Sequence, residues 1–336
     1  MQPPLALTMG EPGGVGPDLT LAVWLDRHRL QIPPFYLLAD PDFVAERMRL
    51  IGLDCPTEVT EAAAAASIFD RALPVVPLEA RVRAEPGRAD PANAGAVVEA
   101  IARAVGDVRS GAGAAIVTNP IHKQSLYAAG FRHPGHTEFL GTLSSAWSGT
   151  TARPVMMLAG PELRAVPVTI HIPLRDVAET LSEALIVETG RIVAADLRRR
   201  FGIPSPRLAV AGLNPHAGEG GAMGTEDQTI IAPAVDVLRA EGLTVTGPLS
   251  ADTMFHPSAR SSYDAALCMY HDQALIPAKT LAFAETVNVT LGLAFVRTSP
   301  DHGTAFDLAG TGRADPSSLA AALRLAATLV ANEHAA

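Results

Sequence analysis

Three histidines in the sequence each follow an apolar run of the kind that forms a buried strand. The runs and the histidines after them are Val166–Ile170 before His171, Leu208–Pro215 before His216, and Ala265–Tyr270 before His271. Because the carboxyl ends of parallel strands meet at the ligand-binding edge of an open α/β sheet, we expect the three imidazoles to lie there. Three imidazoles could bind one divalent metal and leave a coordination position for substrate, as catalytic zinc sites do.

The alternative for each histidine is a hydrogen-bonded loop residue, which is the commoner role of a lone histidine at a strand end. The separations of 45 and 55 residues match no compact metal motif, and the sequence contains no HExxH pair. The shared placement after three strands is therefore what favours a metal site. Asp272 and Asp252 are candidates to orient a metal-binding histidine through a hydrogen bond to its ring.

Only two of the 26 basic residues are lysines, Lys123 and Lys279, and the other 24 are arginines. Lysine carries a compact, titratable ammonium group, whereas arginine carries a larger planar group that keeps its proton. Each lysine therefore marks a position where arginine would not serve, unless it survives by chance under the compositional bias. Composition alone leaves both interpretations open.

Two glycine-rich segments, Gly10–Gly16 and Asn214–Gly221, are candidates for close approach to a ligand. The first follows a predicted strand and precedes a predicted helix, but it has neither the GxGxxG dinucleotide motif nor the Lys-Ser/Thr pair of a P-loop. It could bind an anion through backbone amides at the helix N-terminus, or it could be only a structural turn. In the second segment, small residues beside His216 allow the backbone to approach a ligand closely.

Strand and helix patterns alternate along the chain, which predicts an α/β fold with a largely parallel sheet. The predicted strands are Leu5–Thr8, Phe35–Leu38, Ala114–Val117, Pro154–Leu158, Ala165–Ile170, Leu208–Leu213 and Ala265–Met269. The predicted helices are one that begins near Asp18, then Phe43–Leu50, Ala62–Ala66, Ala92–Val108, Arg175–Leu181, Glu183–Arg199 and Thr229–Ala240. Between Arg153 and Ile170 only a Gly-Pro turn separates two strands, so we expect an antiparallel hairpin there.

Length and composition exclude several classes of protein. The 336 residues suffice for about two domains, and 48% hydrophobic residues can bury a core, which excludes a disordered chain. No apolar stretch approaches the length of a membrane span, and the N-terminus lacks the pattern of a signal peptide. A formal charge of −9 without a basic tract argues against nucleic acid as a partner. The two cysteines, Cys55 and Cys268, are compatible with the reducing cytoplasm, where we expect the protein.

Seven longer motifs occur in order over more than 300 residues of the chain. They are TMGEPGGVGPD at Thr8–Asp18, TNPIHK at Thr118–Lys123, GHTEFL at Gly135–Leu140, GLNPHAGEGGAMGTED at Gly212–Asp227, GPLSADTMF at Gly247–Phe255, MYHDQALIPAK at Met269–Lys279, and VNVTLGLAFVRTSPDHGTAFDLAGTGRAD at Val287–Asp315. Together these motifs resemble the 4-hydroxythreonine-4-phosphate dehydrogenase family of pyridoxal phosphate biosynthesis.

The resemblance implies two α/β/α domains like those of isocitrate and isopropylmalate dehydrogenases, with the active-site cleft between the domains. The expected domains are residues 1–125 with 290–336, which carry a cofactor loop at 301–316, and residues 126–289, which carry the metal and substrate site and dimer contacts. The resemblance also implies a homodimer with a shared active site. It further implies NAD as the cofactor, with NADP as the alternative, and one divalent metal, which would be Zn, Mg, Co or Mn.

The same resemblance implies roles for individual residues. The metal ligands would be the three histidines already selected by their placement, His171, His216 and His271. The substrate contacts would be His136, Thr137, Lys279, Asn288 and Arg297, and the cofactor contacts would be His302, Gly303, Thr304, Ala305 and Asp315. The candidates for proton transfer are Lys279, Asp252 and, from its place near two histidines in the sequence, Lys123.

The resemblance therefore implies an enzyme that oxidises 4-phosphohydroxy-L-threonine. The product, 2-amino-3-oxo-4-phosphooxybutanoate, is a β-keto acid that would lose CO2 to give 3-amino-2-oxopropyl phosphate. A related dehydrogenase acting on D-erythronate or D-threonate 4-phosphate would carry the same motifs. Two other classes stay open, a metal-dependent hydrolase or aldolase that needs no nicotinamide, and a non-catalytic phosphoester-binding protein.

Overall fold

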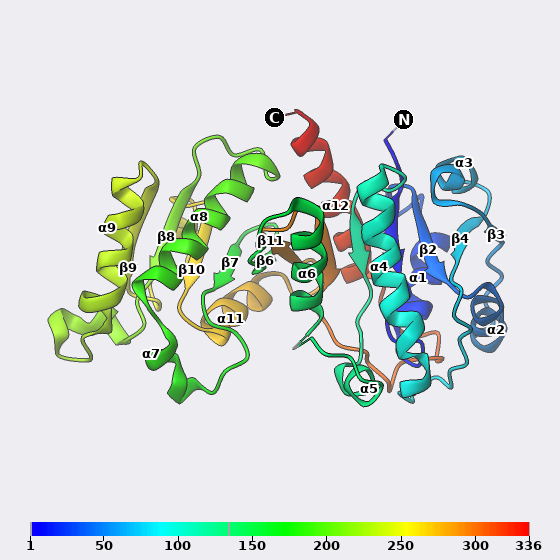
Figure 1. Ribbon diagram of the computed structural model, residues 1–336. Coiled ribbons are helices and arrows are strands. Elements are labelled where there is room, and N and C mark those ends of the chain that lie inside the picture. The colour runs from blue at the N-terminus through cyan, green and yellow to red at the C-terminus, as the bar shows by residue number, and fades with distance from the viewer. Residues whose placement is uncertain (1, 134, 336) are drawn as a thin grey trace. The chain divides into compact units, whose positions relative to one another are not determined.

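The computed structural model describes residues 2–133 and 135–335, and Figure 1 labels its helices and strands. The chain clusters into two compact units. Unit 1 comprises Met1–Pro154 and Leu293–Val330, and unit 2 comprises Val155–Gly292 and Ala331–Ala336. The domains expected from the sequence, residues 1–125 with 290–336 and residues 126–289, stay predictions. The outer ends of the expected domains, Met1 and Ala336, lie outside the described residues.

Unit 1 is built on parallel strands in the order β3-β4-β2-β1-β5-β12. Their bounds are β1 Leu5–Thr8, β2 Phe35–Ala39, β3 Thr57–Val59, β4 Leu73–Pro77, β5 Ile116–Thr118 and β12 Arg297–Pro300. Every residue of β1 and β2 is buried. This explains why both strands are continuous apolar runs in the sequence rather than alternating patterns.

Several helix ends in unit 1 are marked by capping residues in the sequence, as α2 illustrates. The helices are α1 Gly16–Leu25, α2 Pro41–Ile51, α3 Ala65–Ile68, α4 Ala94–Ser110, α5 Lys123–Ala128, α6 His136–Ser148 and α12 Ser317–Ala335, of which the last runs beyond the unit. At the start of α2, the Asp40 carboxylate accepts a hydrogen bond from the amide of Asp42, and Gly52 ends the helix at a φ of 68°. The long helix α4 packs its buried face along β1, β2 and β5 (Figure 1).

Unit 2 has strands in the order β11-β6-β7-β10-β8-β9, of which β7, β10, β8 and β9 run parallel. Their bounds are β6 Val155–Ala159, β7 Arg164–Pro167, β8 Arg207–Ala211, β9 Thr244–Leu249, β10 Ala265–Cys268 and β11 Val287–Leu291. The helices are α7 Val177–Thr180, α8 Glu183–Arg199, α9 Ala232–Ala240, α10 Pro257–Arg260 and α11 His271–Ala282. Strands β6 and β7 form the predicted antiparallel hairpin, and β11 also pairs antiparallel with β6.

Small side chains let α11 lie close to the sheet of unit 2. Ala274 and Ala278 of the helix are buried in one apolar cluster with Ala209, Ala266 and Cys268 of strands β8 and β10. The helix contacts β6, β7 and β10. Because the first residue of α11 is a histidine, this packing fixes that side chain at the carboxyl end of β10.

The α/β class and the mostly parallel pairing predicted from the sequence are confirmed. Helix α8 has the predicted bounds. The helix predicted over Thr229–Ala240 begins later, at Ala232, because Asp227–Ile231 forms a π-helical turn before it. Across residues 2–133 and 135–335, no helix combines the length and apolar character needed to span a bilayer.

Candidate active site

His171 and His271 lie together beyond the ends of two neighbouring strands of unit 2. Strands β7 and β10 pair in parallel, and the Thr169 hydroxyl donates a hydrogen bond to the carbonyl of Met269 at 2.7 Å just past both strands. The centroids of the two imidazole rings are 5.6 Å apart, with 43° between the ring planes. The tertiary structure therefore brings together two side chains that are 100 residues apart in the sequence.

Asp272 determines which nitrogen of His271 can bind a metal. Its Oδ1 lies 2.7 Å from His271 Nδ1, and a carboxylate only accepts, so the ring donates from Nδ1 and presents the lone pair of Nε2. Metal-binding histidines are commonly held by a carboxylate in this way. Both histidines line a cavity of about 250 Å³ together with Thr169 and Tyr270. This donor set fits a divalent metal that accepts nitrogen ligands.

His216 stands on a left-handed turn. Six consecutive residues, His216 to Gly221, have φ between 42° and 98°. The buried Asp227 carboxylate holds the entry to this turn, since it accepts hydrogen bonds from the amides of Leu213 at 2.9 Å and Asn214 at 3.2 Å. At Gly218, where φ is 79°, a Cβ atom would also lie 2.9 Å from a backbone carbonyl oxygen. The close approach at Gly218 is to the carbonyl of Gly224, and an approach of this segment to a ligand stays a prediction.

His216 lies near Asp252 rather than within the pair of His171 and His271. A hydrogen bond from Ser250 Oγ, at 2.5 Å, lowers the pKa of the Asp252 carboxyl, and the neighbouring His216 lowers it further. In residues 2–133 and 135–335 of one chain, no three His, Cys, Asp or Glu side chains are grouped closely enough to hold a metal. A single chain therefore brings together two of the three selected histidines.

Strained backbone is concentrated at the residues selected from the sequence. Among the described residues, the non-glycine positions with positive φ are Gln31, His171, His216, Ala217, Glu219 and Ala305. Of these, His171, His216 and Ala305 are residues selected from the sequence, and Ala217 and Glu219 lie in the turn that carries His216. Left-handed backbone costs a non-glycine residue about 1–2 kcal/mol and persists where the surrounding structure enforces it, commonly at functional sites. This distribution independently favours these segments as functional.

Unit 1 contains a separate group of selected residues around Arg297. The buried Arg297 side chain, on the first residue of β12, donates to Thr118 Oγ1 at 2.6 Å and approaches His136 Nδ1 at 3.5 Å. Burial lowers the pKa of Arg297 to about 10. Lys123 lies beside the same helix start, because its Nζ would be 3.6 Å from a Cβ atom on Gly135. These cations are suited to a phosphate or carboxylate group.

His136 is the first residue of α6 and is kept neutral by its surroundings. Burial lowers the pKa of the imidazole well below 6.5, and the nearby Arg297 and Lys123 lower it further. Because Nδ1 faces the Arg297 guanidinium, Nε2 carries the hydrogen. That Nε2 is shielded from solvent and has no hydrogen-bond partner among the described residues. A buried N–H without an acceptor is a binding point for an anionic oxygen.

The neutral His136 should make the fold less stable in acid. The unfolded chain binds a proton at this position below a pH of about 6.5, whereas the folded chain does not, so stability falls as pH falls. The loss is at most about 1.4 kcal/mol per pH unit below that point. We expect His136→Gln to remove this part of the acid sensitivity, measured by urea unfolding at several pH values. The exposed control His28→Gln should behave as wild type, and an unchanged pH slope in His136→Gln would contradict the assignment.

The loop 301–316 lies against the glycine-rich segment 10–16 within unit 1. The amide of Val15 donates to the carbonyl of Thr304 at 2.9 Å, and a Cβ on Gly14 would lie 3.0 Å from the same oxygen. In the same loop, His302 Nδ1 lies 2.9 Å from the carbonyl oxygen of Gly303. Thr304, one of the residues selected for the cofactor, thus lies against the glycine-rich segment.

The structure favours the turn interpretation of Gly10–Gly16 over the anion-binding one. The amides of Gly13 and Gly14 donate to the side chain and the carbonyl of Glu11, and the amide of Val15 donates to Thr304. These amides are therefore already used within the protein. Gly10 has a φ of 74°, and a Cβ atom there would lie 2.6 Å from the carbonyl oxygen of Pro120, so glycine is required.

The remaining selected residues lie on ordinary elements. Lys279 is on α11, with its Nζ 5.5 Å from the centre of the Phe283 ring, and Asn288 is on β11. Thr137 is the second residue of α6. Asp315 accepts hydrogen bonds from the amide and hydroxyl of Ser317 at the start of α12, so it has a structural contact whatever else it binds.

Several residues at these sites were not found by sequence reasoning. Asp227 and Thr118 lie inside quoted motifs, but only the fold shows the backbone that Asp227 holds and the guanidinium that Thr118 contacts. For Thr118, its place at the end of an apolar run was the available signal, whereas Asp227 lies far in the sequence from any strand end. Arg47, which is buried beneath the glycine-rich segment, gave no signal because an arginine on an amphipathic helix normally faces solvent.

Comparison with known proteins gives consistent matches along the chain. The family model described as pyridoxal phosphate biosynthetic protein PdxA matches residues 31–326. A protein of Bradyrhizobium diazoefficiens named 4-hydroxythreonine-4-phosphate dehydrogenase is 57% identical over 336 residues, which cover 98% of this chain and 97% of the relative.

Solved structures agree with this match. The crystal structure of 4-hydroxythreonine-4-phosphate dehydrogenase from Klebsiella pneumoniae is similar with a TM-score of 0.85 and 36% identity, covering 98% of this chain and 99% of that chain. A terephthalate 1,2-cis-dihydrodiol dehydrogenase from Burkholderia xenovorans is similar with a TM-score of 0.63 and 29% identity, covering 97% and 98% of the two chains.

Proposed function

The chain belongs to the PdxA family of pyridoxal phosphate biosynthetic proteins, and we propose that it is a 4-hydroxythreonine-4-phosphate dehydrogenase that uses NAD and a divalent metal. The observation that carries the proposal is the pair of His171 and His271, with Asp272 holding one ring ready to ligate. NADP is the alternative cofactor. The metal is Zn, Mg, Co or Mn, since imidazole ligands with an open position accept several divalent ions.

The metal is held by His171, His216 and His271 in a homodimer whose active site is shared between subunits. The absence of a three-residue group within the described part of one chain supports this arrangement. So does a cavity of about 470 Å³ in unit 2, whose lining includes the carboxylates Asp252 and Asp272 and the apolar side chains Phe255 and Ile276. Ile276 is 64% exposed in the single chain. Apolar surface beside an incomplete ligand set is suited to a second copy.

Arg297, His136 and Lys279 bind the anionic ends of the substrate. Arg297 can grip a phosphate or carboxylate through two parallel hydrogen bonds, and Lys279 supplies a point charge. His136 donates its buried Nε2–H to a substrate oxygen. Thr137 and Asn288 add neutral hydrogen-bonding groups. Residues His302 to Ala305 and Asp315 bind the dinucleotide.

Oxidation of the substrate hydroxyl requires the loss of one proton and one hydride. When bound, the metal would polarise the hydroxyl oxygen, and NAD would accept the hydride. Lys279 and Lys123 are the candidate proton acceptors. Asp252, whose pKa is lowered from an already acidic value, is the weaker base, and it instead orients His216. The product is a β-keto acid that loses CO2 because the ketone accepts the electrons of the breaking bond.

A substrate panel tests the proposed function. With divalent metal and NAD+, 4-phosphohydroxythreonine is expected to give NADH absorbance at 340 nm, whereas D-erythronate and D-threonate 4-phosphate should give little. A signal only with the latter two would reassign the substrate. Phosphate release or carbon–carbon cleavage without nicotinamide would favour a hydrolase or aldolase, and no turnover of any of these compounds would overturn the enzyme assignment.

A further inference from the structure

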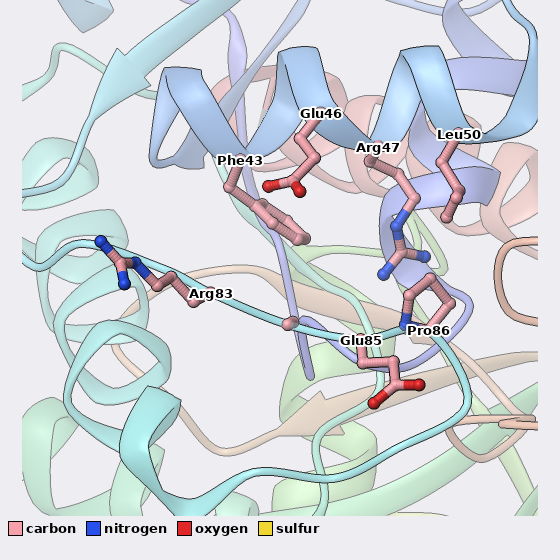
Figure 2. A pocket seen from close by; sticks show the side chains of 8 residues that line it. Phe43, Glu46, Arg47, Leu50, Arg83, Glu85 and Pro86 are labelled. Carbon is pink, nitrogen blue, oxygen red and sulfur yellow. The ribbon is translucent and has the colours of Figure 1, made fainter.

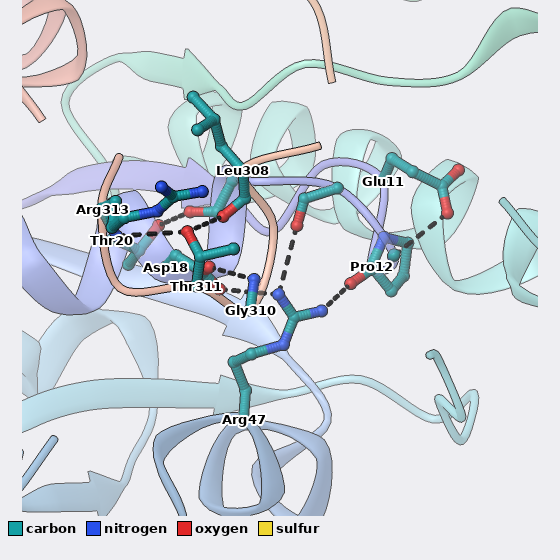
Figure 3. Close-up of polar contacts among 12 residues, drawn as sticks. Glu11, Pro12, Asp18, Thr20, Arg47, Leu308, Gly310, Thr311 and Arg313 are labelled. Atoms are coloured by element: carbon teal, nitrogen blue, oxygen red, sulfur yellow. Dashed lines mark hydrogen bonds and ion pairs between the residues drawn. The ribbon is translucent and has the colours of Figure 1, made fainter. Parts of the chain in front are cut away.

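A buried ion pair in unit 1 joins segments that are far apart in the sequence. Arg47 of α2 and Asp18 of α1 have side chains only 1% and 3% exposed, and Arg47 Nη1 lies 2.6 Å from Asp18 Oδ1. Figure 3 shows the Arg47 guanidinium reaching toward Pro12 on one side and Asp18 on the other. The pair lies directly beneath the glycine-rich segment and not within the residues selected for chemistry.

Arg47 fixes the glycine-rich segment by donating to its backbone. Its guanidinium donates to the carbonyl of Pro12 at 2.5 Å and to the carbonyl of Gly14 at 3.2 Å, in addition to the Asp18 carboxylate. A planar guanidinium that binds three oxygens constrains both the position and the orientation of this turn.

Asp18 connects the same turn to loop 301–316. While its Oδ1 binds Arg47, its Oδ2 accepts a hydrogen bond from the amide of Gly310 at 2.6 Å. A second hydrogen bond, from the Val15 amide to the Thr304 carbonyl, also joins the loop to the glycine-rich segment. The loop is therefore attached on either side of Ala305, whose φ is 41°: to Val15 of the glycine-rich segment through Thr304, and to Asp18 of α1 through Gly310.

Two apolar side chains border both Gly310 and a neighbouring cavity. A cavity of about 560 Å³ lies between α2 and the segment 83–86, and its wall includes Arg47, Leu50 and Pro86 (Figure 2). Leu50 and Pro86 are also the side chains nearest to Gly310, within 3.4 Å of where a Cβ atom would stand. Gly310 is therefore bordered closely by apolar side chains on this side, while its amide donates to Asp18.

A buried ion pair adds little net stability, because the cost of desolvating two charges offsets their attraction. Its consequence is geometric: if either partner moves away, a buried charge is left without its counter-charge, which is strongly unfavourable. If Gly310 moved away, Asp18 could keep its hydrogen bond to the Gly310 amide only by breaking its ion pair with Arg47. The pair therefore disfavours conformations in which the loop separates from the glycine-rich segment.

We propose that Arg47 and Asp18 are positioning residues that hold loop 301–316 in the conformation that binds the dinucleotide. The inference rests on the proposed function, which assigns the dinucleotide to this loop. Neither residue needs to touch the cofactor. If only a fraction of molecules has the loop in place, the apparent Kd rises in inverse proportion to that fraction.

The test compares Arg47→Met with Arg49→Met, an exposed arginine on the same helix. In the full-length chain without substrate, titration calorimetry is expected to show the NAD+ Kd raised about tenfold or more by Arg47→Met and unchanged by Arg49→Met. Hydrogen exchange at the Gly310 amide should become faster in Arg47→Met alone. A merely structural role would lower the melting temperature of Arg47→Met but leave the NAD+ Kd of the folded protein unchanged.

The proposal is overturned if folded Arg47→Met binds NAD+ within twofold of wild type, whatever the exchange rate of its Gly310 amide. Should Arg47→Met not fold, Asp18→Asn takes its place, since the neutral amide weakens the hold on Gly310 while keeping an oxygen toward Arg47. Failure of the proposed function is recognised separately, by wild-type protein that binds no NAD+. In that case the exchange rate of Gly310 alone decides whether the pair positions the loop.

Discussion

Replacing His216 with alanine is expected to lower the rate of NADH formation by at least about a hundredfold. Partners that only orient a metal-binding histidine already contribute about 10- to 100-fold to affinity or activity, so loss of a ligand should cost more. His216 is exposed on its left-handed turn and contributes little buried apolar surface. The fold should therefore survive, and Asp227 should still hold the turn through the backbone of residues 213 and 214.

Metal content provides a readout that does not depend on turnover. Binding of Co2+, followed by its visible absorption, is expected to weaken in His216→Ala and to remain at the wild-type level in the exposed control His28→Ala. Chelation of the metal from wild-type enzyme should reproduce the loss of activity, and added Zn2+ or Co2+ should restore it. Full activity in His216→Ala, or in metal-free wild-type enzyme, would rule out the metal assignment.

Replacing Arg297 with lysine is expected to raise the KM for the phosphorylated substrate by about 10- to 100-fold. A hydrogen bond to a charged group contributes about 1.5–3 kcal/mol, and a lysine cannot form the paired contacts of a guanidinium. The shorter, compact ammonium would also lose the Thr118 contact that aims the side chain. Because the site is buried, solvent cannot replace the missing interaction.

Separate measurements distinguish lost substrate binding from general damage. The NAD+ Kd, determined without substrate, should be unchanged in Arg297→Lys, and the melting temperature should remain near that of wild type. Arg109→Lys, on the exposed last turn of α4, is the matched control and should leave KM unaltered. A wild-type KM in Arg297→Lys would remove Arg297 from the substrate site.

The regular elements followed from local patterns in the sequence. Neighbouring residues suffice to encode burial and short-range backbone geometry. Such local patterns predicted the apolar strands β1, β2, β8 and β10, the Gly-Pro turn of the hairpin and the amphipathic helix α8. The placement of His171 and His271 also followed, because parallel strands must end at one edge of the sheet. Strand β11 was not found, since its antiparallel pairing with β6 joins segments more than 120 residues apart.

By itself, then, the sequence determined the fold class, the placement of histidines after the ends of strands and the family motifs that relate this chain to known dehydrogenases. Only the tertiary structure decided that His216 lies beside Asp252, that the amides of the glycine-rich segment are used within the protein, and that Arg47 and Asp18 hold loop 301–316. The physical reason is distance along the chain. Burial and turn preferences act between near neighbours, whereas an ion pair between two helices depends on how the whole chain packs.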